Sequence, residues 1–165
     1  SSKKQQSSKA AKQKNGCTPH LEAQRTGKTV NESSTGKTLQ EIYDEGMAVR
    51  REVLGDAHVD RANEAKDGFT TDFQDMITRY AWGTIWTRPG LDRKMRSAIT
   101  LTALIAHGHM EELAMHVRAA LRNGLTRDEI KEILLQSAIY CSVPSANSAF
   151  KVAQHVFAEL DAAEN

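Results

Sequence analysis

From Leu39 onward, apolar residues recur at intervals of three and four, which is the period of one buried face of an α-helix. No segment alternates apolar and polar residues in the way that predicts a half-buried strand. In chain order, the periodic segments predict helices near 42–54, 59–65, 71–86, 93–105, 110–122, 127–139 and 145–160, the second of them on a weak signal. Short turns separate these segments. The sequence therefore predicts an all-α fold, with one compact helical domain over 39–163.

Local signals support the predicted boundaries. Thr71-Asp-Phe-Gln74 and Thr126-Arg-Asp-Glu129 have the spacing of capping boxes, in which a hydroxyl and a side chain three residues later satisfy free backbone amides. Asp92 follows a Pro-Gly turn and is a good N-cap. The segment 93–105 is apolar on most sides, which favours burial between several helices or at a subunit contact. A homo-oligomer is therefore expected.

Residues 1–38 differ in composition from the rest of the chain. They contain no Phe, Trp or Tyr and carry eight Lys/Arg against two Asp/Glu, whereas the remainder carries 14 and 19. Such a segment cannot bury enough apolar surface to offset its ordering entropy, so the sequence predicts a disordered basic tail or a non-native leader. Its lysines are scattered and no aromatic residue is available to stack on bases. A nucleic-acid partner is therefore not expected.

The chain also lacks the apolar stretch of a signal peptide and the roughly 18 uninterrupted apolar residues of a membrane span. No membrane partner is expected, and the predicted location is cytoplasmic. Cys17 and Cys141 lie in unlike contexts and form no Cys-x-x-Cys motif. Neither a disulfide framework nor a zinc site is indicated.

The segment 109–116 carries the strongest chemical signal. His109, Glu112 and His116 are separated by three, four and seven residues, so they share one stripe of the predicted helix. Judged singly, each histidine is more often a capping or packing residue, and Glu112 a solvated charge. Three such groups on one stripe favour a site instead.

Proton transfer fits this stripe better than metal binding does. His109 and His116 are two helical turns apart, roughly 10.5 Å along the axis, which is too far for one ion with bonds of about 2 Å. Histidine titrates near neutral pH, and a neighbouring carboxylate can orient it and fix its tautomer. The sequence therefore predicts an acid–base site with no metal ligands.

Arginine and aromatic residues flank this stripe in the sequence. Arg88 lies between Trp86 and Pro89, and Arg96 lies one turn inside a largely apolar helix, where a guanidinium needs a partner. Either could bind a carboxylate in a bidentate manner or belong to an ordinary surface. Trp86 is expected in the core or a pocket wall. Tyr140 and Asn147 flank Val143-Pro144 and could line a pocket or serve helix ends.

Four sequence blocks together resemble the carboxymuconolactone decarboxylase family. They are Trp86-x-Arg-Pro-Gly-Leu-Asp92, Gly108-His-Met-Glu-Glu-Leu-Ala-Met-His116-x-Arg118-Ala-Ala, Arg122-Asn-Gly-Leu-Thr126 and Tyr140-Cys-Ser-Val-Pro-Ser-Ala-Asn147. The resemblance covers 41–160, about three quarters of the chain. It implies an all-helical fold assembled as a homohexamer, with no cofactor. It further implies decarboxylation of gamma-carboxymuconolactone, a small dicarboxylate lactone, to beta-ketoadipate enol-lactone in protocatechuate catabolism.

The wider superfamily includes alkylhydroperoxidase-like proteins with a Cys-x-x-Cys-x-x-x-His motif. In this chain His109 and Glu112 stand where the two cysteines would be, and His116 stands at the histidine. Dithiol chemistry is therefore impossible at these positions, which favours the decarboxylase branch over the peroxidase branch.

The resemblance suggests roles for the site residues. His116 is the expected general acid with Glu112 orienting it, although the reverse division remains open. Arg88 and Arg96, or one of them with His109, are expected to hold a carboxylate and stabilise the enolate oxygen. Trp86, Tyr140 and Asn147 complete the expected substrate-binding set. The alternatives are a related decarboxylase or isomerase for another small oxo-acid, and a non-catalytic helical assembly protein.

Overall fold

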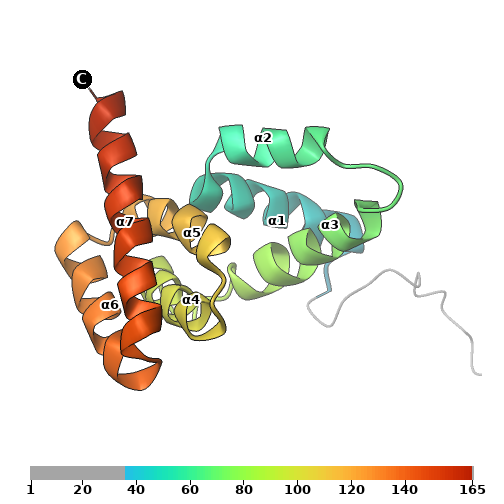
Figure 1. The fold of residues 1–165 in the computed structure, drawn as a ribbon. Coiled ribbons are helices and arrows are strands. Elements are labelled where there is room, and N and C mark those ends of the chain that lie inside the picture. The colour runs from blue at the N-terminus through green and yellow to red at the C-terminus, as the bar shows by residue number, and fades with distance from the viewer. Residues whose placement is uncertain (1–35, 165) are drawn as a thin grey trace, which may run out of the picture. The chain divides into compact units, whose positions relative to one another are not determined.

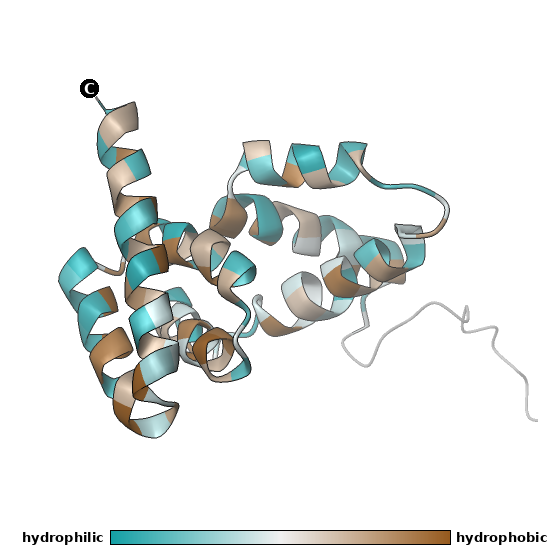
Figure 2. Cartoon of the chain, viewed as in Figure 1, coloured by the Kyte–Doolittle hydropathy of each residue, from teal (hydrophilic) through white to brown (hydrophobic). Residues whose placement is uncertain are grey.

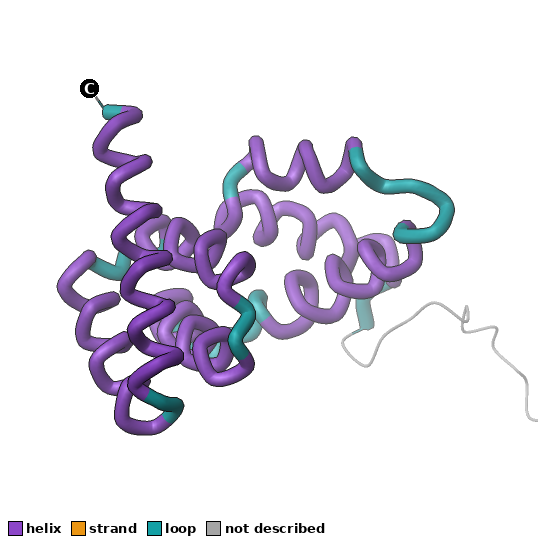
Figure 3. Tube along the Cα trace, in the orientation of Figure 1, coloured by secondary structure: helices purple, strands orange, loops and turns teal. Residues whose placement is uncertain are grey.

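The computed structural model describes residues 36–164, which form eight helical segments and contain no β-strand (Figures 1 and 3). The segments are α1 (Leu39–Leu54), α2 (Asp56–Glu64), α3 (Thr71–Ile77), η1 (Thr78–Ile85), α4 (Arg93–His107), α5 (Met110–Arg122), α6 (Arg127–Tyr140) and α7 (Val143–Ala163). The all-α prediction is confirmed. Most of the predicted tail, residues 1–35, lies outside the described residues. No helix in the described part is both long and apolar enough to cross a membrane.

Side-chain caps begin several of these helices where the sequence predicts them. Thr126 and Glu129 form both hydrogen bonds of a capping box at the start of α6, and the Asp92 carboxylate accepts from the Met95 amide at α4. The capping box predicted at Thr71 is wrong, because Thr71 is already the first residue of α3. Instead, the Asp67 carboxylate accepts hydrogen bonds from the amide and the hydroxyl of Thr70, the residue before α3.

The predicted helix 71–86 changes its hydrogen-bond pattern halfway along. From Thr78 to Ile85 it is a π-helix, η1, and the Trp86 amide donates to the Ala81 carbonyl five residues earlier at 2.9 Å. The Thr84 hydroxyl donates to the Arg79 carbonyl, again five residues back, at 2.9 Å. This wider turn rotates the residues that follow it, including Trp86, relative to those of α3.

η1 crosses α1 at unusually short range, through two glycines. A Cβ on Gly46 would lie 2.2 Å from the Thr78 carbonyl oxygen, and a Cβ on Gly83 would lie 2.3 Å from the Ile42 carbonyl oxygen. No larger side chain fits between these backbones. The crossing therefore depends on glycine at both positions.

The buried side chains form two clusters, and α5 contributes to both. In the ribbon, α5 lies between α1 and the group of α4, α6 and α7 (Figure 1), and its turns carry both apolar and polar residues (Figure 2). The larger cluster holds Leu113, Val117 and Ala120 of α5 together with residues of α4, α6 and α7. The smaller joins Ala119 of α5 to buried residues of α1, α2 and η1, with Met115 and Trp86 against it. Helix α5 therefore faces both clusters, and its residues between the two faces lie at their junction.

We expect Gly83→Ala to lower the free energy of unfolding by about 1–3 kcal/mol or more, because the added methyl group would overlap the α1 backbone. Urea denaturation measures the change. Gly68→Ala is the control, since a Cβ there meets nothing within 4 Å. Equal stability of the two variants would mean that α1 and η1 separate without cost.

Candidate functional site

The stripe predicted on α5 runs from the exposed start of the helix into the smaller cluster. His109 is the N-cap residue of α5 and its ring stacks on that of His107, with centroids 5.9 Å apart. His109 and Glu112 are exposed, His116 is half-buried, and Ala119, one turn further along the stripe, is fully buried among residues of α1, α2 and η1. The three predicted residues therefore form a path from solvent to the junction of the two clusters.

His116 is the member of this stripe with a perturbed titration. Its pKa is lowered to about 4, mainly by burial and then by the nearby His58, while Glu112 acts in the opposite direction. Its Nδ1 is buried and makes no hydrogen bond within the described structure. At neutral pH the unliganded protein therefore carries a neutral imidazole here, with one ring nitrogen uncommitted.

His58 is a neighbour of this site that sequence analysis missed. It lies on α2, and its pKa is lowered by burial first and then by the charges of Arg50, Arg61 and Arg122. A periodic pattern identifies residues that share one helix face. It gives no signal for two histidines on different helices, 58 positions apart in the chain.

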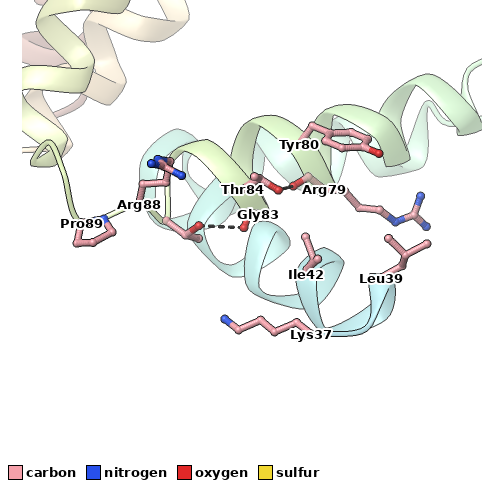
Figure 4. A pocket seen from close by; sticks show the side chains of 10 residues that line it. Lys37, Leu39, Ile42, Arg79, Tyr80, Gly83, Thr84, Arg88 and Pro89 are labelled. Atoms are coloured by element: carbon pink, nitrogen blue, oxygen red, sulfur yellow. Dashed lines mark hydrogen bonds between the residues drawn. The ribbon is translucent and has the colours of Figure 1, made fainter. Parts of the chain in front are cut away.

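The two predicted arginines are joined to each other. Arg96 Nη2 donates to the backbone carbonyl of Arg88 at 3.0 Å, while Arg96 Nε is buried without an acceptor. Arg96 thus ties α4 to Arg88, in the segment between η1 and α4. The Arg88 side chain is exposed and lines a cavity of about 470 Å³ beside Arg79, Lys37 and Tyr80 (Figure 4).

The α5 stripe does not line the Arg88 cavity, whose walls come from α1, η1 and the residues flanking them. Within one chain, the structure therefore does not bring Arg88 and the stripe into a single cavity. Trp86 is nearer to the stripe. It packs on Trp82, with ring centroids 5.2 Å apart, against the same cluster as Met115.

Tyr140 and Asn147 lie away from the stripe, on the α6–α7 side. Tyr140 is 80% exposed and lines an apolar cavity of about 730 Å³ with Met95 and Ile99 of α4. Asn147 is exposed on α7. Within residues 36–164, no hydrogen bond joins either side chain to the stripe, and the cavity that Tyr140 lines does not include it. A second subunit could bring them to the same site.

The lowered pKa of His116 gives stability a pH dependence. Because the folded protein holds this imidazole neutral while the unfolded chain binds a proton below pH 6.5, the stabilising contribution is complete above pH 6.5 and is lost as pH falls towards 4. We expect the free energy of unfolding to fall less steeply across this window in His116→Gln than in the wild type, measured by urea denaturation. His155→Gln, at an exposed position on α7, is the control. Parallel curves for wild type and His116→Gln would contradict the assignment.

The chain is 46% identical over 121 residues to the 4-carboxymuconolactone decarboxylase of Acinetobacter baylyi, which covers 73% of this chain and 90% of that protein. It is 40% identical over 130 residues to the nitrosuccinic acid decarboxylase of Metarhizium robertsii, which covers 79% and 91%. A 4-carboxymuconolactone decarboxylase from Pseudomonas putida is 63% identical over 41 residues, 25% of this chain and 85% of that sequence.

Residues 71–155 match the sequence model of the carboxymuconolactone decarboxylase family. The matched region includes η1, the Arg88 segment and the whole α5 stripe. The family resemblance seen in the motifs is confirmed: the chain belongs to the carboxymuconolactone decarboxylase family.

Proposed function

We propose that this protein decarboxylates 4-carboxymuconolactone to beta-ketoadipate enol-lactone, as a cytoplasmic carboxy-lyase of protocatechuate catabolism. The observation that carries the proposal is the 46% identity across 90% of the Acinetobacter baylyi 4-carboxymuconolactone decarboxylase. The α5 stripe supports it by supplying groups suited to proton transfer.

The chemistry of the substrate defines what the protein must do. The lactone carries a carboxylate on a ring carbon and a carboxymethyl arm. When the bond to the ring carboxylate breaks, its electron pair moves through the ring double bond onto the lactone carbonyl oxygen, and carbon dioxide leaves. A proton then adds to the carbon next to the carbonyl. Because the ring accepts the electrons itself, this sequence requires no metal or organic cofactor.

His116 is the proposed proton donor, with Glu112 orienting it and His109 at the solvent end of the stripe. The imidazole of His116 is neutral in the unliganded protein because burial lowers its pKa to about 4. Negative charge on a bound dianion and on the dienolate favours the protonated ring and raises this pKa. Substrate binding would thus favour protonation of His116, so that it can act as the general acid.

The reverse assignment, with Glu112 as donor and His116 as its partner, uses the same geometry. Arg88 and Arg96 remain the proposed ligands of the developing enolate oxygen. For Arg88 this role requires a neighbouring subunit or a movement of its segment, because the Arg88 cavity of one chain does not include the stripe. Trp86 is the proposed apolar wall for the departing carboxylate, since loss of hydration favours release of neutral carbon dioxide.

Assembly into a homo-oligomer, a hexamer in keeping with the family resemblance, belongs to this proposal. Support comes from the large apolar side chains left exposed on α4 and α6, among which Ile139 is 79% exposed and Tyr140 is 80% exposed. Met95 and Ile99 of α4 belong to the same surface. A subunit contact here would bury these residues and could bring Tyr140 and Asn147 to a neighbour's site.

Nitrosuccinic acid is the second candidate substrate, favoured by the 40% identity to the Metarhizium robertsii decarboxylase over 91% of its length. It is also a dicarboxylate. When the bond to the carboxylate beside the nitro group breaks and carbon dioxide leaves, its electron pair can move onto the nitro group, and a proton then adds to carbon. Both reactions therefore need cations for a dianion and a positioned proton donor. They differ in the electron acceptor.

We expect His116→Ala to lower kcat by about two to four powers of ten, the usual contribution of positioned proton transfer. Carbon dioxide release is measured with 4-carboxymuconolactone and, in parallel, with nitrosuccinate. His155→Ala, which removes an exposed imidazole from α7, should leave kcat unchanged. Turnover near the wild-type rate in His116→Ala would reject the assignment, and faster wild-type turnover of nitrosuccinate would favour the second substrate.

A further inference from the structure

A second concentration of positive charge lies where α1 meets α2. Arg122, the last residue of α5, donates from Nη1 to the carbonyl of Leu54 at 3.0 Å. A Cβ on Gly55 would lie 2.8 Å from Arg122 Nη2, so the guanidinium rests directly on the turn that begins α2. The carbonyl is a neutral partner. Arg122 therefore keeps an uncompensated positive charge in a fixed position.

A cavity of about 520 Å³ opens beside this guanidinium, and His58, Arg61, Arg122 and Met115 are among the residues that line it. Its lining also includes Asp56 and Arg118, each of which has an ion-pair partner: Arg51 at 3.2 Å for Asp56, and Glu159 for Arg118. Within residues 36–164, neither Arg61 nor Arg122 has a carboxylate in ion-pair range. The unpaired charge of the lining is therefore positive.

Arg50 adds a third guanidinium, whose charge acts on His58 of the cavity lining. It is 4% exposed, and its terminal nitrogens donate to Thr78 Oγ1 at 3.2 Å and to Gln74 Oε1 at 3.1 Å, while Nε has no acceptor. Both partners are neutral, so this buried charge is also uncompensated, an arrangement that normally destabilises a fold. The charges of Arg50, Arg61 and Arg122 all act on His58 and lower its pKa, which places the three around one imidazole.

This cavity adjoins the proton-transfer stripe. Met115 is part of its lining, and the next residue along α5 is His116. His58 acts electrostatically on His116 and shares the cavity lining with Arg61 and Arg122. An anion held beside His58 would therefore place the rest of a small molecule next to His116.

We propose that His58, Arg61 and Arg122, here called the His58 pocket, bind the carboxylate that a dicarboxylate substrate retains. The inference rests on the proposed decarboxylase function and adds residues to it. Cations around the departing carboxylate would stabilise the ground state and oppose loss of carbon dioxide. The same cations around the retained carboxylate bind substrate and transition state alike and anchor the reacting carbon near His116. The pocket is thus a recognition site for the second carboxylate.

Kinetics on the full-length protein test the pocket. We expect Arg61→Gln and Arg122→Gln to raise KM for the decarboxylated dicarboxylate about tenfold to a hundredfold, the range for a lost hydrogen bond to a charged group, with kcat changed only a few-fold. Arg61→Lys should recover part of the loss. Arg127→Gln, which removes one positive charge at the start of α6, is the matched control and should leave KM unchanged. Thermal melting of each variant separates misfolding from weakened binding. Because Arg61 is exposed, its replacement should disturb folding less than that of Arg122.

Titration with non-reacting probes keeps this test independent of turnover. Succinate should bind the wild type more tightly than acetate does, and Arg61→Gln should abolish that preference. If the wild type decarboxylates neither substrate, the proposed function fails, but succinate binding that depends on Arg61 still supports the pocket. Unchanged KM and unchanged succinate binding in both glutamine variants would overturn it, as would a site that takes inorganic phosphate and ignores succinate.

Discussion

Contact between the backbones of α1 and η1 determines where the other groups lie. Gly46 and Gly83 let the two helices approach until any side chain at either position would overlap main-chain atoms of the other. On η1 this brings Trp82 into the cluster that covers one side of α5. On α1 it fixes Arg50 one turn beyond Gly46, where the side chain reaches Thr78 and Gln74. The acid–base stripe and the charges behind it therefore depend on two residues that take no part in chemistry.

The buried and half-buried basic groups near His58 lower the stability of the fold but are suited to binding an anion. A buried guanidinium with neutral partners and a half-buried imidazole with a free ring nitrogen both cost folding free energy. A bound dianion, as proposed, would offset each cost, because it would compensate the arginines and favour protonation of His116. The destabilising features of this small domain thus lie together, around α2 and the middle of α5.

Helices could be predicted from the sequence because their signals are local. The spacing of apolar residues locates α4 to α6 closely, and Thr126 with Glu129 caps α6 as expected. Prediction failed where a helix begins without the expected side-chain cap, and where residues distant in the sequence meet in the fold. The expected cap at Thr71 is absent, because α3 begins at Thr71 without a side-chain cap and Asp67 bonds Thr70 instead. The π-helix was not predicted, because its apolar residues recur at nearly the same spacing as those of an α-helix. The stripe on α5 could be read from one helix, whereas the grouping of His58 with Arg50 and Arg122 exists only after three helices pack.

The proposed site would separate substrate recognition into two parts. 4-carboxymuconolactone and nitrosuccinate would each retain a carboxylate, so the proposed His58 pocket would recognise what the two share and would not choose between them. The choice must come from the groups that meet the electron acceptor, a lactone carbonyl in one case and a nitro group in the other. Trp86 packs against the same cluster as Met115, which precedes His116, the proposed proton donor, and Arg96 donates to the carbonyl of Arg88, two residues after Trp86. Variation in the segment from Trp86 to Arg96 would then change the preferred acceptor while leaving the His58 pocket and the α5 stripe intact.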